Sequence, residues 1–204
     1  ARDHLADAEL ALDADGKFLG LRTHTKLPIG AYYTTDRNVG CATSGLGGLA
    51  GVYGIPAVHA QVTGVLTNMM GNAQYRGGAK PEPVHVVEVM VDIAARQLDI
   101  DPAELRRRNT LAPGDMPFKT AMGDTYDCGD FIGNYEDCLA TGEYDRGADR
   151  RADAKSRGKL LGIGTSNSVT GVASTNFEHV EIRFDASGGI TLLSGAMDHG
   201  QGHG

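Results

Sequence analysis

The sequence has no tryptophan, few aromatic residues (6%) and no long apolar run, and each shortage narrows what the chain can be. All of its apolar stretches fall short of the roughly 20 residues that a transmembrane helix needs, so no membrane span is expected. Basic residues are in the minority, with 19 Lys and Arg against 26 Asp and Glu, a formal net charge of −7. Because non-specific nucleic-acid binding needs a basic surface, nucleic acid is excluded as a partner.

Cysteine is scarce as well. Cys41, Cys128 and Cys138 are odd in number and include no close pair, so neither a disulfide framework nor a CxxC zinc site is expected. This usage is typical of a reducing cytoplasm, which is the location we predict. The sequence also lacks an initiator Met and ends within a glycine-rich run, so a fragment of a longer protein is expected.

Glycine, by contrast, is abundant. The chain has 29 among its 204 residues, roughly twice the usual share. They follow no Gly-X-Y period, which excludes collagen. Hydrophobic residues (41%) and charged residues (22%) are close to globular averages, which excludes a wholly disordered chain.

The patterns along the chain predict strands, then helices, then strands. Alternating or β-branched runs predict strand structure at residues 10–12, 18–33, 58–66, 161–163, 180–184 and 190–193. Apolar periodicity and capping residues predict helices at residues 82–98, 101–109 and 130–140. This order favours an α+β fold with mainly antiparallel strands and two or three helices.

The remaining segments carry weaker signals. Residues 34–51 and 110–127 are predicted to be loop, with a weak helix possible at 45–52, and residues 143–159 a solvated helix or linker. The basic run at 106–108 is expected to face water or pair with carboxylates, because it lies on a short capped helix in an acidic chain.

The first candidate site runs from Gln74 to Glu82 and reads Gln-Tyr-Arg-Gly-Gly-Ala-Lys-Pro-Glu. Gly77 and Gly78 let the backbone approach a ligand closely, and Arg76 can grip an anion with its planar guanidinium. The helix predicted to follow would add free N–H groups and a positive dipole end. On these residues alone, an anion cradle and a glycine-rich turn that merely enters a helix both remain open.

The second candidate site lies in the last residues, Asp198-His-Gly-Gln-Gly-His203. Gln201 stands between Gly200 and Gly202, so its amide is presented from a backbone without neighbouring bulk. That arrangement suits bidentate recognition of a polar cofactor edge, and a flexible hairpin end is the alternative. Metal binding by the two histidines is not expected, because three glycines in six residues disfavour the helix that would align them.

Four stretches of the chain, taken in order, resemble the large, molybdenum-binding subunit of the xanthine dehydrogenase, aldehyde oxidase and aerobic carbon monoxide dehydrogenase family. The first two are the opening hairpin, residues 2–16, and the segment from Tyr53-Gly-Ile-Pro56 to Thr67-Asn68. The third runs from Tyr75-Arg-Gly-Gly-Ala-Lys-Pro-Glu82 to Asn109, and the fourth is Gly200-Gln-Gly-His203. The Arg-Gly loop and the Gly-Gln-Gly motif together make the resemblance fairly specific.

The resemblance implies a molybdopterin with molybdenum, in bacterial members usually as the cytosine dinucleotide. Gln201 would hydrogen-bond the cofactor, and the backbone around Arg76 would line the molybdenum site. The cofactor-binding residues implied in this way are Arg76, Gly77, Gly78, Gly200, Gln201 and Gly202. No catalytic or metal-ligating residue is implied, because the family's base glutamate would lie beyond residue 204 and its first cofactor loop before residue 1.

The resemblance also implies an oxidoreductase that hydroxylates an aldehyde or an N-heterocycle with oxygen from water. Electrons would leave through an iron–sulfur subunit to a subunit that carries FAD. The family's loop commonly reads Arg-Gly-Ala-Gly-Arg-Pro-Glu, whereas here the small residues are transposed and a Lys replaces an Arg. Carbon monoxide dehydrogenases carry a copper-binding cysteine in this loop, and residues 74–82 have none, so CO oxidation is disfavoured.

We expect residues 1–158 to be the first part of the molybdopterin-binding region and residues 159–204 the start of the second. Two other classes stay open: a non-enzymatic anion- or phosphate-binding module built on Arg76, Lys80 and the helix start at Glu82, and a subunit-interaction piece with exposed apolar surface. A fragment of this kind is expected to be inactive alone, to lack the cofactor and to self-associate.

Overall fold

The computed structural model describes residues 3–73, 77–171, 179–196, 198, 200 and 202, with Arg37 and Ala42 as backbone only. The chain divides into two compact units, residues 1–170 and residues 171–204, and each is described by itself. In the described part of the chain, no helix combines the length and the apolar character that crossing a membrane requires.

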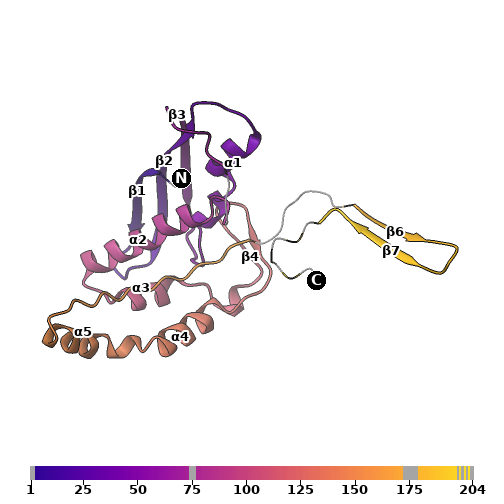
Figure 1. The fold of residues 1–204 in the computed structure, drawn as a ribbon. Helices are drawn as coiled ribbons and strands as arrows, with labels where there is room; N and C mark the ends of the chain where they lie inside the picture. Colours follow the sequence, from indigo (N-terminus) through magenta and orange to yellow (C-terminus); the bar gives the residue numbers. More distant parts are fainter. Residues whose placement is uncertain are drawn as a thin grey trace. The chain divides into compact units, whose positions relative to one another are not determined.

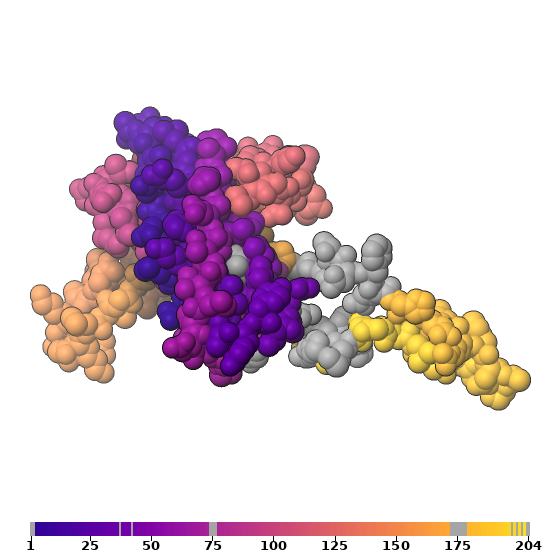
Figure 2. All heavy atoms as spheres, turned by 90° about the horizontal axis from the view of Figure 1, so that it is seen from above, coloured from indigo at the N-terminus to yellow at the C-terminus, as the bar shows by residue number. Residues whose placement is uncertain are grey.

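A three-stranded sheet forms one layer of the first unit, in the order β1-β2-β3 (Figure 1). The strands are β1 (Leu5–Leu12), β2 (Phe18–Gly30) and β3 (Val58–Leu66). Strands β1 and β2 form the predicted hairpin, and the Asp13 carboxylate closes its turn by accepting the N–H groups of Asp15 (2.9 Å) and Lys17 (2.8 Å). In the space-filling view the indigo and purple atoms of the strands lie side by side (Figure 2).

The sheet is covered on one face by α2 (Pro81–Leu98), the best-predicted helix (Figure 1). Val87, Val91 and Ala94 recur on the same face of α2 and are buried against the sheet and the residues before β3. The main core joins these to buried residues from the strands and from the segment between them: Phe18, Leu21, Leu49, Val52, Tyr53, Ile55, Ala95 and Leu105.

Two further predicted helices, α3 (Pro102–Asn109) and α4 (Phe131–Thr141), are confirmed. Asp101 caps α3 by accepting the N–H groups of Ala103 (2.8 Å) and Glu104 (3.1 Å). The Glu104 carboxylate, in the first turn of α3, pairs with Arg108 one turn further along the helix. The expected solvated segment contains a short turn of 3₁₀ helix, η3 (Tyr144–Arg146), and the mostly exposed helix α5 (Gly147–Ser156).

The predicted loop at residues 34–51 is wrong at α1 (Asp36–Thr43), whereas the 3₁₀ turn η1 (Leu46–Leu49) lies where a weak helix was expected. The buried side chain of Asn38 starts α1 by accepting the N–H groups of Thr34 (3.0 Å) and Thr35 (2.9 Å). Its amide also donates to the Asn72 carbonyl. This helix start therefore depends on a partner far away in the sequence.

Two smaller predictions also fail. The predicted loop at 110–127 contains a 3₁₀ turn, η2 (Pro113–Asp115), and a short hairpin of β4 (Phe118–Lys119) and β5 (Thr125–Tyr126). The strand predicted from Leu161 is an extended segment without a ladder. Its odd-numbered residues from 161 to 169 are the less exposed ones, so the alternation is present but no strand pairs with it.

The second unit contains the predicted second hairpin, β6 (Val180–Phe184) paired antiparallel with β7 (Ile190–Ser194). Three of the four strand pairings among the described residues are antiparallel, and β2–β3 is parallel, so the α+β class is confirmed. One face of the hairpin is apolar and exposed, with Phe184 at 76% and Ile190 at 67%. A lone two-stranded hairpin is marginal in water, so this face needs a covering element.

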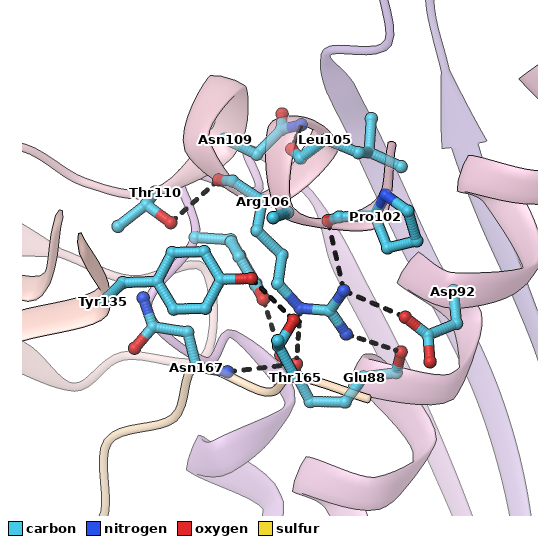
Figure 3. A network of polar contacts seen from close by, with 12 residues as sticks. Glu88, Asp92, Pro102, Leu105, Arg106, Asn109, Thr110, Tyr135, Thr165 and Asn167 are labelled. Atoms are coloured by element: carbon cyan, nitrogen blue, oxygen red, sulfur yellow. Dashed lines mark hydrogen bonds and ion pairs between the residues drawn. The ribbon is translucent and has the colours of Figure 1, made fainter. Parts of the chain in front are cut away.

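A buried ion pair joins the helices of the first unit (Figure 3). Arg106 on α3 is fully buried, and its Nε donates to Glu88 Oε2 on α2 at 2.9 Å. One terminal nitrogen donates to Asp92 Oδ1 at 2.9 Å. Burial lowers the pKa of Arg106, but the charge of Glu88, the nearby Tyr53 and the hydrogen bonds to Asp92 and Glu88 together raise that pKa above its ordinary value.

Glu88 has two further partners. The Tyr53 hydroxyl donates to Glu88 Oε1 at 2.6 Å, and the backbone N–H of Asn167 donates to Oε2 at 3.1 Å. Burial, followed by the charge of Glu88, raises the pKa of Tyr53 above its ordinary value, so Tyr53 stays a donor. The carboxylate thereby holds α3, the segment before β3 and the extended segment after α5 at one point.

Replacing Arg106 with Met should lower the free energy of unfolding by about 3–5 kcal/mol, because Glu88 is left buried and uncompensated. Arg108→Met removes the exposed pair with Glu104 and a hydrogen bond to the Asp15 carbonyl, and should cost less than about 1 kcal/mol. Urea unfolding followed by tyrosine fluorescence measures both. Equal stability of the two variants would contradict the role of the buried pair.

Two substitutions in the link between α2 and α3 should change the free energy of unfolding in opposite directions. Asp101→Ala removes the N-cap acceptor and should cost about 1 kcal/mol. Asp99 ends α2 in a left-handed conformation (φ 53°), which glycine adopts without strain. Asp99→Gly should therefore raise the free energy of unfolding by about 0.5 kcal/mol. Thermal unfolding measures both variants. Melting temperatures that shift in the same direction would show that the assignment of the helix caps is wrong.

Candidate functional site

The first glycine-rich candidate forms a tight turn at the start of α2. Gly77 (φ 99°), Gly78 (φ 43°) and Ala79 (φ 67°) are three successive left-handed residues. The N–H of Lys80 closes the turn on the Gly77 carbonyl at 2.9 Å. Glycine adopts such positive φ values without strain, and the close approach of a ligand to Gly77 and Gly78 stays a prediction. Arg76, with Gln74 and Tyr75, lies outside the described residues.

The turn is held in place by the segment that follows α1. The Ser44 hydroxyl donates to the Gly78 carbonyl at 2.9 Å. A Cβ on Gly45 would lie 1.8 Å from the Ala79 carbonyl oxygen, so only glycine permits this approach of two backbones. Gly45 thus allows the segment after α1 to lie against the turn.

The start of α2 is poorly suited to hold an anion. Pro81 and Pro83 have no N–H, so the first turn of the helix lacks two of its usual donors. Glu82, in the same turn, adds a negative charge. The expected contribution of free N–H groups is therefore reduced, and the anion cradle built on Lys80 and Glu82 finds no support here.

The second candidate is a turn with two left-handed glycines, Gly200 (φ 94°) and Gly202 (φ 84°). The Gly200 N–H donates to Asp198 Oδ1 at 2.8 Å. Among the described residues, no atom lies within 4 Å of a Cβ built on either glycine. Gln201 and the two histidines, His199 and His203, lie outside the described residues.

The four described glycines occupy turns of the predicted kind in two different units. Their joint site, together with Arg76 and Gln201, stays a prediction. Among the residues with assigned positions, no group of three or more His, Cys, Asp or Glu side chains is arranged to hold a metal ion.

A groove of about 750 Å³, which no sequence pattern predicted, lies beside the first turn. Ala79, Gly45 and Cys41 line it where it meets the turn. Cys41 is buried, and burial, followed by the nearby charge of Glu82, raises the pKa of its thiol. A thiol kept protonated in this way is a weak nucleophile and a weak metal ligand. No spacing signal could have placed Cys41 beside Ala79, because α1 was not predicted.

Two family models match the chain. Both describe a molybdopterin cofactor-binding domain, one over residues 1–110 and the other over residues 137–204. These matches cover both glycine-rich turns. The first model therefore contains the turn before α2, and the second contains Gly200 and Gly202.

Curated relatives align over the whole chain. The carbon monoxide dehydrogenase large chain of Hydrogenophaga pseudoflava is 35% identical over all of this chain and 27% of its own length. The nicotine 6-hydroxylase large subunit of Paenarthrobacter nicotinovorans is 28% identical over all of this chain and 26% of its own length. The chain thus spans about a quarter of the length of these relatives.

A solved structure of quinoline 2-oxidoreductase from Pseudomonas putida 86 has a TM-score of 0.80 and 29% identity, over all of this chain and 28% of that one. A structure of the Cu,Mo-CO dehydrogenase has a TM-score of 0.78 and 27% identity, with the same coverage. The two family models match more than half of the chain, and the solved structures share its fold. The chain belongs to the family of molybdopterin cofactor-binding domains.

Proposed function

We propose that the chain is part of the cofactor-binding large subunit of a molybdenum hydroxylase, an oxidoreductase that oxidises an aldehyde or an N-heterocycle with oxygen from water. The observation that supports it is the pair of glycine turns, each within a matched molybdopterin-binding region. The chain covers about a quarter of its relatives, so the activity belongs to the whole subunit and the chain alone is inactive.

The residues of both turns fit a cofactor that is held through main-chain groups. At Gly200 and Gly202 the left-handed backbone has no atom near the Cβ positions, which leaves room for a large ligand. Gln201 would donate to and accept from the cofactor edge, and Gly77 and Gly78 with Arg76 would line the molybdenum side. When bound, the cofactor would supply the redox chemistry of the hydroxylation.

The substrate class follows from the turn and from Cys41. Residues 74–82 contain no cysteine, and the Cys41 thiol close to Ala79 has a raised pKa, so neither offers a thiolate for copper. This disfavours CO as the substrate although carbon monoxide dehydrogenase large chains are among the relatives. Nicotine hydroxylase and quinoline oxidoreductase, whose names contain N-heterocycles, are equally full-length matches to this chain.

The remaining parts of the proposal come from the resemblance to the family. The cofactor would be the molybdopterin cytosine dinucleotide, and the partners an iron–sulfur subunit and a subunit that carries FAD. Residues 1–158 and 159–204 would contribute to two successive molybdopterin-binding regions, whereas the matched models cover residues 1–110 and 137–204. A cytoplasmic location stays a prediction from cysteine usage.

The substrate proposal is tested on the complete complex with an artificial electron acceptor. Purified enzyme should reduce the acceptor with aldehydes or N-heterocycles and should not do so with CO. Turnover of CO at a rate comparable to the best organic substrate would contradict the argument from Cys41 and residues 74–82.

Gly200→Ala should lower the molybdenum content of the purified complex on the order of tenfold, which corresponds to about 1.4 kcal/mol of lost binding. The matched control is Gly188→Ala in the β6–β7 turn, because Gly188 also has a left-handed φ (88°) and open space around its Cβ position. Elemental analysis should show full molybdenum in the control. Equal losses in both variants would mean that backbone strain, not cofactor contact, is the cause.

Gly45→Ala should also lower the molybdenum content, because the new Cβ must displace the Ala79 carbonyl and with it the turn at 77–80. Gly48→Ala is the control within the same stretch, since its nearest neighbour, Pro83 Cγ, is at an ordinary 3.5 Å. A fully loaded Gly45→Ala complex would show that the position of the turn does not matter for the cofactor.

A further inference from the structure

We propose that the groove beside the turn binds a helix of the same subunit, and that this helix comes from a part of the subunit outside these 204 residues. The proposal rests on the conclusion that the chain is part of a larger subunit, and not on the identity of the cofactor or substrate. The groove has a volume of about 750 Å³ and lies between the inner face of the sheet and the first half of α2.

The wall formed by α2 is the first argument. One face of this helix is used by the core, through Val87 and Val91. A second group of apolar side chains on the same helix lines the groove instead: Val86, Val89, Met90 and Ile93. A helix that is apolar on more than one side is normally covered on each of them, and Val89 is still 39% exposed.

The wall formed by the sheet is the second argument. Ala6 and Ala8 point to the inner face of β1 and line the groove, and their small side chains let another backbone come close. Strand β1 is also an edge of its sheet as described. Edges of this length are usually covered by a helix or another strand in native proteins.

A second copy of this chain is the less suitable occupant. On its outer face β1 carries Asp7 and Glu9, and Glu9 is paired with Arg22 of β2. Antiparallel pairing of two β1 strands would bring these carboxylates of both copies near one another, which is unfavourable. The same charges disfavour pairing of the β1 edge with an identical strand.

A helix of the same subunit has what the groove requires. The relatives contain roughly three times as many residues outside the matched part as inside it, so enough chain is available. The groove is apolar along its floor, with Leu27, Val62 and Met90 among the residues that line it. An amphipathic helix with an apolar stripe would match this floor.

The test places one cysteine on α2 in the full-length subunit, with the buried Cys41 replaced by Ala and the exposed Cys128 and Cys138 by Ser, and labelling is read on the α2 peptide alone by mass spectrometry. Val89→Cys lies in the groove, and Leu98→Cys is its control, because it is on the same helix, has the same 39% exposure and does not line the groove. Maleimide labelling rates are compared between native and denatured protein. Labelling at position 89 should slow by at least about a hundredfold on folding, and at position 98 by less than about tenfold.

A photo-crosslinking residue at position 89 then identifies the occupant by mass spectrometry. A crosslink to a peptide of the same subunit outside residues 1–204 is the expected result. Rapid labelling at position 89, equal protection at both positions, or protection that appears only when the partner subunits are bound would each overturn the proposal. Molybdenum content is measured separately, so a subunit without the metal and with a covered groove would refute the function alone.

Discussion

The first unit depends on the buried ion pair between Arg106 and Glu88. A buried charge is tolerated only when every lone pair and every N–H around it has a partner, so the pair recruits donors from distant segments. Tyr53 comes from the segment before β3, and Asn167 from the extended segment after α5. The axis of α2 is fixed in this way against the rest of the unit, and the turn at 77–80 is fixed with it.

The glycines of the two turns have different surroundings in each unit. Gly45 lets one backbone lie directly on the Ala79 carbonyl, and the left-handed residues before α2 turn the chain sharply into the helix. At Gly200 and Gly202 the same residue type does the opposite and leaves space free. An unusual glycine content therefore has two separate physical uses in this chain, close backbone contact and open backbone.

The parts of the fold that could be predicted carry their own local signals. The Asp13–Gly16 turn, the Asp101-Pro cap and the 3.6-residue period of α2 need no distant partner. Helix α1 was missed because Asn38 starts it with help from Asn72. Pairing of the 106–108 run with carboxylates was expected, but the complete burial of Arg106 was not, since its partner Glu88 lies on another helix. The resemblance to the family, rather than any periodicity, pointed to the cofactor.

The central claim is that this chain helps to hold a molybdopterin within a larger subunit. The most direct measurement is elemental analysis of that subunit, purified with its companion subunits, together with analysis of the nucleotide released by acid hydrolysis. The account predicts about one molybdenum and one CMP for each copy of the chain. Absence of both, from a host that loads related enzymes, would contradict it.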